Sequence, residues 1–209
     1  MSNIPELKLS KKGNELLKMY KLMVNDGYNN NLFNIKNYKK FLKNTFNENQ
    51  INSVLDYGSG RSDWNDKSFD QDNNLSAINY FNLDKVYQYE PTNDINYKKI
   101  AECVLCFDVL EHIFISDLSK VVSDLYYHAS KLLVLQVACY EAKAKLPNGE
   151  NAHITLRNPI WWKGFVDAVS SNFKIKTILI CSTAFNKASV FKSWSVDEWN
   201  NRLEYKIDL

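Results

Sequence analysis

The chain has 209 residues, a normal length for one domain and enough to bury a substantial core. A hydrophobic content of 45% and an aromatic content of 13% exclude an intrinsically disordered protein. The net charge of +2 gives no strong electrostatic signature of DNA or RNA binding. The sequence has neither a signal-peptide pattern nor an apolar run of about 18 residues, so we expect a soluble, cytoplasmic protein without membrane association.

All cysteines of the chain lie in apolar, strand-like runs: Cys103, Cys106, Cys139 and Cys181. Cys103 and Cys106 form a C-x-x-C pattern, but residues three apart in a strand point to opposite faces. No second pair with the spacing of a zinc site is present. We therefore expect buried free thiols and no metal bound by cysteine.

Apolar residues at helical spacing predict a helix over residues 5–24, and Asn25-Asp26-Gly27 ends it with a glycine signal. The same spacing predicts a second helix over residues 34–47. We therefore expect a helical extension over residues 1–50 and one domain over residues 51–209.

Strand-like and helix-like segments alternate from residue 51. This alternation is typical of an α/β protein with a mostly parallel sheet and helices on both faces. The last two apolar runs, residues 174–181 and 188–192, predict an antiparallel strand pair. The other expected strands cover residues 52–57, 85–89, 102–107 and 132–138, and the expected helices cover residues 75–83, 116–130, 160–171 and a short segment from Ser195.

The first of these strands ends in VLDYGSG, residues 54–60, where two apolar residues lead into an acid and a Gly-x-Gly turn. Gly58 and Gly60 can adopt positive φ and let a ligand approach the backbone, and we expect Asp56 to aim an acceptor into the same crevice. No third glycine follows in the dinucleotide frame, and no P-loop is present. An acid before the glycines suits a cationic ligand better than a pyrophosphate, which favours S-adenosylmethionine (SAM). An ordinary turn after a strand is the alternative.

Two further segments extend this interpretation. Residues 101–113, AECVLCFDVLEHI, run from a short buried strand into a helix start, and residues 146–153, LPNGENAH, form a polar loop. Together with VLDYGSG they resemble the class I SAM-dependent methyltransferases, in particular a small bacterial and phage subgroup with YDP-like and LPNGENAH-like motifs. The resemblance covers about residues 50–165. It implies a Rossmann-like fold that binds SAM and releases S-adenosylhomocysteine.

In that superfamily a helix, a strand and a residue beside adenine normally follow the second strand. Here only about a dozen residues separate Glu90 from the strand at 102–107, too few for a helix and a strand. We therefore expect the third strand to be reduced or missing. The helical extension either closes over the cofactor, as is common in these enzymes, or covers one face of the sheet.

The resemblance implies a cofactor site at the ends of three strands. The expected cofactor-binding residues are Asp56, Tyr57, Gly58, Ser59, Gly60, Glu90, Asp108 and Val109. Glu90 would accept hydrogen bonds from both ribose hydroxyls, or else would be a surface residue of a turn. Asp108 would hold the amino group of SAM or orient the acceptor, or else would cap the helix that begins near Ile113.

Two histidines are candidate catalytic residues. His112 resembles the histidine of the DVLEH pattern, which packs beside the methyl group in relatives. His153 lies in the polar loop, where a neutral imidazole suits the removal of a hydroxyl proton; stapling of that loop is its alternative role. Glu150, Asn151 and Trp161 are the expected acceptor-binding residues; the alternative role of Glu150 and Asn151 is to orient His153. The leaving group of a sulfonium is neutral, so no metal is expected.

The expected function is methyl transfer from SAM to a small-molecule or sugar-type acceptor, at oxygen. A second possibility is a nucleic-acid or protein acceptor, which would need a basic stripe near the crevice. A third is a methyltransferase-like module that binds without catalysis. The sequence indicates neither the acceptor nor the oligomeric state.

Overall fold

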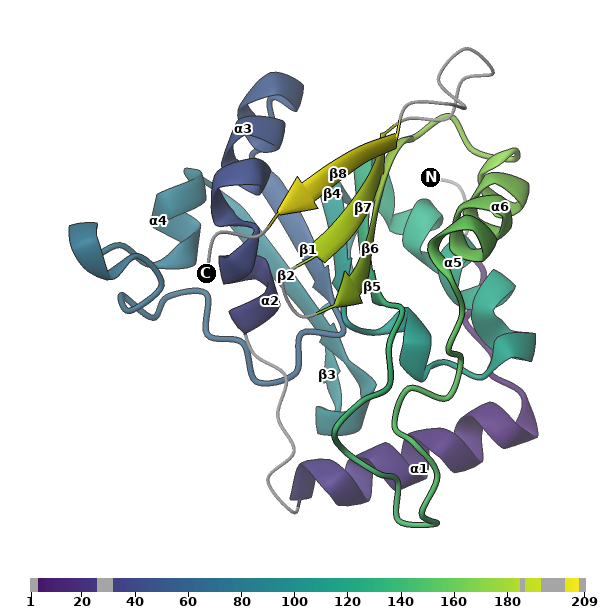
Figure 1. Ribbon diagram of the computed structural model, residues 1–209. Helices are drawn as coiled ribbons and strands as arrows, with labels where there is room; N and C mark the ends of the chain where they lie inside the picture. Colours follow the sequence, from purple (N-terminus) through teal and green to yellow (C-terminus); the bar gives the residue numbers. More distant parts are fainter. Residues whose placement is uncertain (1–3, 26–31, 185–186, 193–201, 207–209) are drawn as a thin grey trace.

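The computed structural model describes residues 4–25, 32–184, 187–192 and 202–206. Its strands are β1 (Ser53–Tyr57), β2 (Lys85–Glu90), β3 (Ile95–Asn96), β4 (Ala101–Phe107), β5 (Ala129–Ala138), β6 (Lys176–Ala184), β7 (Lys187–Lys192) and β8 (Arg202–Lys206). Within the described residues they form one sheet in the order β3-β2-β1-β4-β5-β6-β7-β8, which lies at the centre of the molecule (Figure 1).

The pairing of the strands makes this sheet mostly parallel. β2, β1, β4, β5 and β6 pair in parallel, and β6, β7 and β8 pair antiparallel. The predicted α/β fold with a C-terminal antiparallel pair is confirmed. The third strand is reduced, as expected, because β3 has two residues and runs antiparallel to β2.

The C-terminal region adds a strand that the sequence analysis did not predict. Residues 193–201, where a short helix from Ser195 was expected, lie outside the described residues. Beyond them β8 pairs with β7. Its sequence RLEYK alternates charged and apolar residues, which is the pattern of a strand at the edge of a sheet.

Helices cover both faces of the sheet (Figure 1). One face carries α5 (Leu118–His128) and α6 (Pro159–Ser170), and the other carries α2 (Phe33–Asn37), α3 (Lys39–Asn49) and α4 (Ala77–Phe81). Successive strand residues point to opposite faces, so Leu55 packs on the α5 side and Val54 on the α3 side. The same alternation places Cys103 and Cys106 on opposite faces of the sheet. All four cysteines are free thiols, as expected.

The first helix, α1 (Lys11–Asn25), lies across the carboxyl ends of the parallel strands (Figure 1). It begins later than predicted because Ser10 caps it: the Gly13 N–H donates to Ser10 Oγ at 3.0 Å. Its buried side chains pack on Leu146 and Ala152, in the long loop after β5. The helix therefore covers an edge of the sheet and not a face.

Helices α2 and α3 replace the single helix predicted over residues 34–47. Tyr38 separates them with a φ of −106°, and its buried ring packs edge-on against Phe107. Both helices share one core with β1, to which Phe46 and Val54 belong. Helices α2 and α3 therefore cover one face of the sheet, whereas α1 lies across its carboxyl edge. Among the described residues, no helix combines the length and hydrophobicity that a membrane span requires.

Candidate functional site

A cavity of about 600 Å³ lies between α1 and the carboxyl ends of β1, β2 and β4. Ligands of open α/β sheets bind at this edge, and small-molecule sites usually measure about 300–1,000 Å³. The expected site residues that line it are Tyr57, Gly58, Gly60, Glu90, Asp108, Val109 and His112. The expected site residues outside its lining are Asp56, Ser59, Glu150, Asn151, His153 and Trp161.

The turn after β1 requires glycine at its first position. Gly58 has a φ of +83°, and its N–H donates to the Tyr89 carbonyl at 2.8 Å. A β-carbon at Gly58 would lie 2.3 Å from Val109 Cγ2, well inside van der Waals contact. Gly60 has a φ of +55°, and its N–H donates to Glu90 Oε2 at 2.9 Å. The turn is therefore packed tightly against the neighbouring strand ends.

Glu90 ends β2 and connects it to the glycine turn. The residue is buried, with 8% of its surface exposed, although it borders the cavity. Oε2 accepts the Gly60 bond, and Oε1 accepts from the N–H and the hydroxyl of Thr92, in the turn η2 (Pro91–Asn93). A carboxylate offers about four lone-pair sites, so acceptor capacity is left for a ligand. Glu90 is thus not an exposed turn residue.

Asp56 and Ser59 lie behind the turn. Asp56 Oδ2 accepts from Trp64 Nε1 at 2.8 Å. Burial raises the pKa of Asp56 to about 7; the Trp64 bond opposes this shift and the charge of Glu90 adds to it. Strand alternation turns the Asp56 carboxylate to the face opposite Tyr57, away from the crevice in which we expected it. Ser59 is also buried and outside the cavity lining.

Tyr57 lies on the cavity side of β1, in a network that the sequence analysis missed. Its hydroxyl donates to Asp124 Oδ2 at 2.8 Å, and Lys98 binds the same oxygen at 2.8 Å. Burial and the charge of Asp124 raise the pKa of Tyr57 well above its usual value. The rings of Tyr57 and Tyr89 lie 4.6 Å apart and form one wall of the cavity. Neither Asp124 nor Lys98 belongs to a recognisable motif, so the sequence offered no signal for them.

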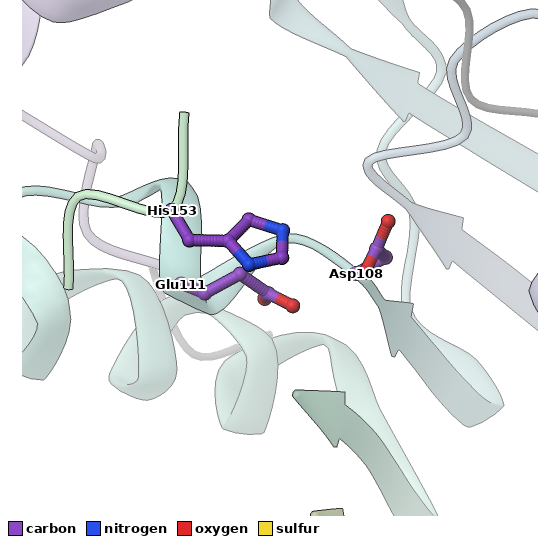
Figure 2. A group of neighbouring side chains, drawn as sticks. All are labelled: Asp108, Glu111 and His153. Atoms are coloured by element: carbon purple, nitrogen blue, oxygen red, sulfur yellow. The ribbon is translucent and has the colours of Figure 1, made fainter. Parts of the chain in front are cut away.

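A polar cluster follows β4. Asp108 has a φ of +58°, which non-glycine residues rarely adopt, and its N–H donates to the Gln136 carbonyl at 3.1 Å. Glu111 follows in the turn η3 (Leu110–His112) and is fully buried. One carboxylate oxygen each of Asp108 and Glu111 and one ring nitrogen of His153 lie within 4.8 Å of one another (Figure 2).

Glu111 is the member of this cluster that the sequence analysis did not single out. Its Oε1 accepts from the Ala138 N–H, at the end of β5, whereas Oε2 is buried without a hydrogen-bond partner among the described residues. Burial and the nearby charge of Asp108 raise the pKa of Glu111 well above its usual value. The available signal was its position three residues after Asp108, within the DVLEH motif.

Hydrogen bonds fix the tautomers of both candidate histidines, because a carbonyl only accepts. His153 Nδ1 donates to the Tyr140 carbonyl, which staples the loop and leaves Nε2 without a proton in the neutral ring. His112 Nδ1 donates to the Ala152 carbonyl at 2.8 Å, with the same consequence. Burial lowers the pKa of His112 to about 4. The Asp108 carboxylate opposes this shift, and the His153 imidazole adds to it. The two rings lie 4.9 Å apart, edge to face.

The three expected acceptor-binding residues lie elsewhere. Asn151 stabilises its own loop, because its side chain accepts from the Ala142 N–H at 3.0 Å and donates to the Ala142 carbonyl at 2.9 Å. Glu150 is exposed at the turn of that loop. Trp161 stacks on Phe165, one turn further along α6, with ring planes 8° apart. Since α6 packs on a face of the sheet, its first turn does not reach the cavity.

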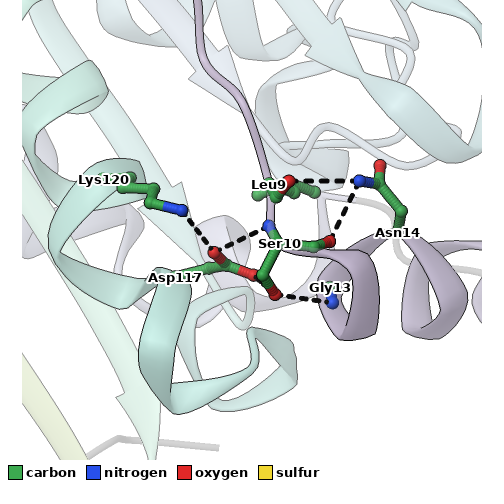
Figure 3. A network of polar contacts seen from close by, with 6 residues as sticks. All are labelled: Leu9, Ser10, Gly13, Asn14, Asp117 and Lys120. Carbon is green, nitrogen blue, oxygen red and sulfur yellow. Dashed lines mark hydrogen bonds and ion pairs between the residues drawn. The ribbon is translucent and has the colours of Figure 1, made fainter.

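Helix α1 forms the roof of the cavity, and its N-terminus is attached to the turn η4 (Ile115–Asp117) (Figure 3). Asp117 accepts from the Ser10 N–H at 2.9 Å and from the Ser10 hydroxyl at 2.6 Å, and Lys120 binds it at 3.0 Å. Burial alone would raise the pKa of Asp117, but these bonds outweigh burial and lower it. A β-carbon at Gly13 would lie 2.2 Å from Asp117 Oδ2, so glycine permits this close approach.

Comparisons of the chain with models of protein families, with curated proteins and with solved structures found no match. The likeness to methyltransferases therefore rests on the short motifs alone. The geometry of the cavity is an independent basis for a functional hypothesis.

Proposed function

We propose that this protein is a SAM-dependent methyltransferase that methylates a small-molecule or sugar-type acceptor at oxygen. The observation that carries the proposal is the buried Glu90, which joins the end of β2 to the glycine turn on the wall of the cavity. An acid at this place in an α/β fold accepts hydrogen bonds from ribose hydroxyls. The VLDYGSG and DVLEHI motifs support the same function by resemblance.

The charges around the cavity suit a cationic nucleoside. Glu90 and Asp108 supply carboxylates, whereas the basic side chains of the described lining are Lys8 and His112, and burial holds the pKa of His112 at about 4. The described lining contains no arginine, the side chain that most often binds phosphate. SAM carries a sulfonium, an amino group and a ribose but no phosphate, so its chemistry matches these residues.

Each part of the cavity wall has a role in this proposal. Glu90 accepts from one sugar hydroxyl with the lone-pair site that its three hydrogen bonds leave, and Asp108 holds the amino group. Gly58 keeps side chains away from the ligand at the turn. The packed rings of Tyr57 and Tyr89 give the ligand an apolar surface. When bound, SAM supplies an electrophilic methyl group whose transfer leaves a neutral thioether.

An oxygen acceptor must lose its proton during the transfer. His153 is our first choice for the residue that takes it, because Nε2 of its neutral ring carries no proton and the ring lies beside Asp108. His112 lines the cavity itself, but its pKa of about 4 makes it a poor proton acceptor at neutral pH. We assign His112 the task of positioning the acceptor.

The roof formed by α1 favours a small acceptor over a nucleic acid or a protein, because a macromolecule must reach the cavity past this helix. We also propose a cytoplasmic location. The four free thiols support it, since disulfides are rare in that reducing compartment.

Isothermal titration calorimetry with SAM and S-adenosylhomocysteine tests the proposal. Glu90→Gln removes the charge and places an amide NH2 against the N–H of Gly60 or of Thr92, and we expect a loss of affinity of about 10–100-fold, the equivalent of one charged hydrogen bond, in a variant whose folding is checked by circular dichroism. Glu102 lies at the amino end of β4, away from the cavity, so Glu102→Gln is the matched control and should bind both ligands as the wild type does. The proposal would be contradicted if the wild-type protein bound neither SAM nor S-adenosylhomocysteine.

A further inference from the structure

We propose that Asp108, Glu111 and His153 bind a divalent metal ion beside the cavity. One ligand atom from each residue lies within 4.8 Å of the others, so a single cation with bonds of about 2.0–2.4 Å can reach all three after small adjustments. The turn after β4 supplies both carboxylates and the loop after β5 supplies the imidazole. Figure 2 shows the Glu111 carboxylate beside the His153 ring, with the Asp108 carboxylate across from both. A metal ion was not expected from the sequence, because methyl transfer from a sulfonium releases a neutral leaving group and needs no metal.

His153 already has the tautomer of a metal ligand. Its Nδ1 donates to the Tyr140 carbonyl, so the lone pair is on Nε2. A carbonyl bonded to the second ring nitrogen is the usual device that orients a metal-binding histidine. Hydrogen bonds of Asn151 fix the loop. Its Oδ1 accepts from the His153 N–H at 2.9 Å, and its side-chain amide also forms hydrogen bonds with the N–H and the carbonyl of Ala142. Asn151 therefore acts by positioning His153.

Glu111 is an independent indication of a ligand. Its side chain is fully buried, and Ala138 satisfies Oε1, but Oε2 has no donor among the described residues; the nearby Asp108 carboxyl can bond to Glu111 only if one of the two carries a proton. An orphaned carboxylate oxygen in a dry site is strongly unfavourable. The Asp108 carboxylate faces the same space and adds repulsion. A cation removes both penalties; a proton shared by the two carboxyl groups is the alternative.

The donor set indicates the kind of ion. Two carboxylate oxygens and one imidazole suit Mn²⁺, Fe²⁺ or Zn²⁺, and the absence of a thiolate from the cluster disfavours Cu⁺. Three protein ligands leave coordination positions open, which is typical of catalytic and not of structural sites. Asp108 belongs both to the cluster and to the cavity lining, so the ion would border the cavity.

The existence of this site does not depend on SAM, but its catalytic role rests on the proposed function. An acceptor oxygen that binds a divalent ion loses its proton more readily. His153 then serves as a ligand instead of the base.

Titration of the metal-free protein with Mn²⁺, without SAM, tests the site; the electron paramagnetic resonance signal measures the unbound ion. We expect one Mn²⁺ per chain, displaced by Zn²⁺. Glu111→Gln and His153→Gln should each weaken binding at least about 10-fold, and Asp108→Asn is a third variant in case a buried substitution prevents folding. Glu102→Gln is the matched control and should bind as the wild type does.

The site is overturned if the folded wild-type protein binds neither Mn²⁺ nor Zn²⁺ at millimolar concentration, as a shared proton would predict. It is also overturned if the folded variants bind as the wild type does. Calorimetry of the metal-free protein with S-adenosylhomocysteine separates the two proposals. If the protein binds S-adenosylhomocysteine but no metal ion, the metal site is wrong and the proposed function stands. If it binds a metal ion but no S-adenosylhomocysteine, the metal site stands and the proposed function is wrong.

Discussion

Substitution of Gly58 by alanine tests the packing of the glycine turn. The φ of +83° is unfavourable for any residue with a β-carbon, by about 1–2 kcal/mol. The new β-carbon would also lie 2.3 Å from Val109 Cγ2, and relief of such overpacking costs about 1–3 kcal/mol more. We therefore expect Gly58→Ala to lower the free energy of unfolding by about 2–5 kcal/mol.

Gly149 is the matched control because it separates strain from collision. Its φ is +88°, but a β-carbon there meets nothing within 4 Å, so Gly149→Ala should cost only the strain of about 1–2 kcal/mol. Combining Gly58→Ala with Val109→Ala should recover part of the loss, with a coupling of about 1–2 kcal/mol. Urea unfolding followed by tryptophan fluorescence measures each value. Equal costs for the two glycine substitutions, or no coupling with Val109, would refute the reasoning.

Three titratable groups give further predictions. The pKa of Asp56 rises from 3.8 to about 7 on folding, so the free energy of unfolding should fall by up to about 4 kcal/mol as pH rises from 4 to 7; Asp56→Asn should flatten this decline in urea titrations, and an unchanged slope would contradict the shift. Asp117 acts in the opposite sense, because its hydrogen bonds with Ser10 lower its pKa. These bonds stabilise the fold above about pH 4, and the stabilisation is lost as the pH falls through the lowered pKa. At pH 7 Asp117→Asn should lower the free energy of unfolding by about 1–3 kcal/mol, and no measurable loss would show that Asp117 does not hold α1 in place. His112, with a pKa of about 4, should show no change of its ring-proton resonances between pH 5 and 8, whereas a midpoint near 6.5 would contradict its burial.

The sheet could be predicted from the sequence because its central strands are apolar on both faces. Residues 103–107 of β4 form a continuous apolar run, which is typical of a parallel strand covered on both sides. The positions of Gly58, Glu90 and Asp108 at strand ends followed from the same alternation of strands and helices. Parallel strands bring their carboxyl ends to one edge, so the location of the cavity was also predictable.

The orientation of individual side chains was harder to predict. Asp56 directly precedes Tyr57, and only the folded chain shows which of these faces the cavity and which faces Trp64. Trp161 was expected at the site, but its direction depends on how α6 packs. Glu111 belongs to the DVLEH motif, but only the fold shows that its charged side chain is fully buried.

The position of α1 also lay beyond sequence reasoning. Its apolar periodicity shows that one side is buried but does not show against what. Its attachment depends on the contact between Ser10 and Asp117, residues far apart in the chain that match no motif. Contacts of this kind are set by the tertiary fold.

The central claim is that the cavity holds the sugar of SAM against Glu90. A crystal structure of the protein with S-adenosylhomocysteine tests this most directly. We expect density for the nucleoside between the glycine turn and α1, with a ribose hydroxyl within hydrogen-bond distance of the Glu90 carboxylate. Nucleoside density at another site, or a ribose without contact to Glu90, would contradict the account.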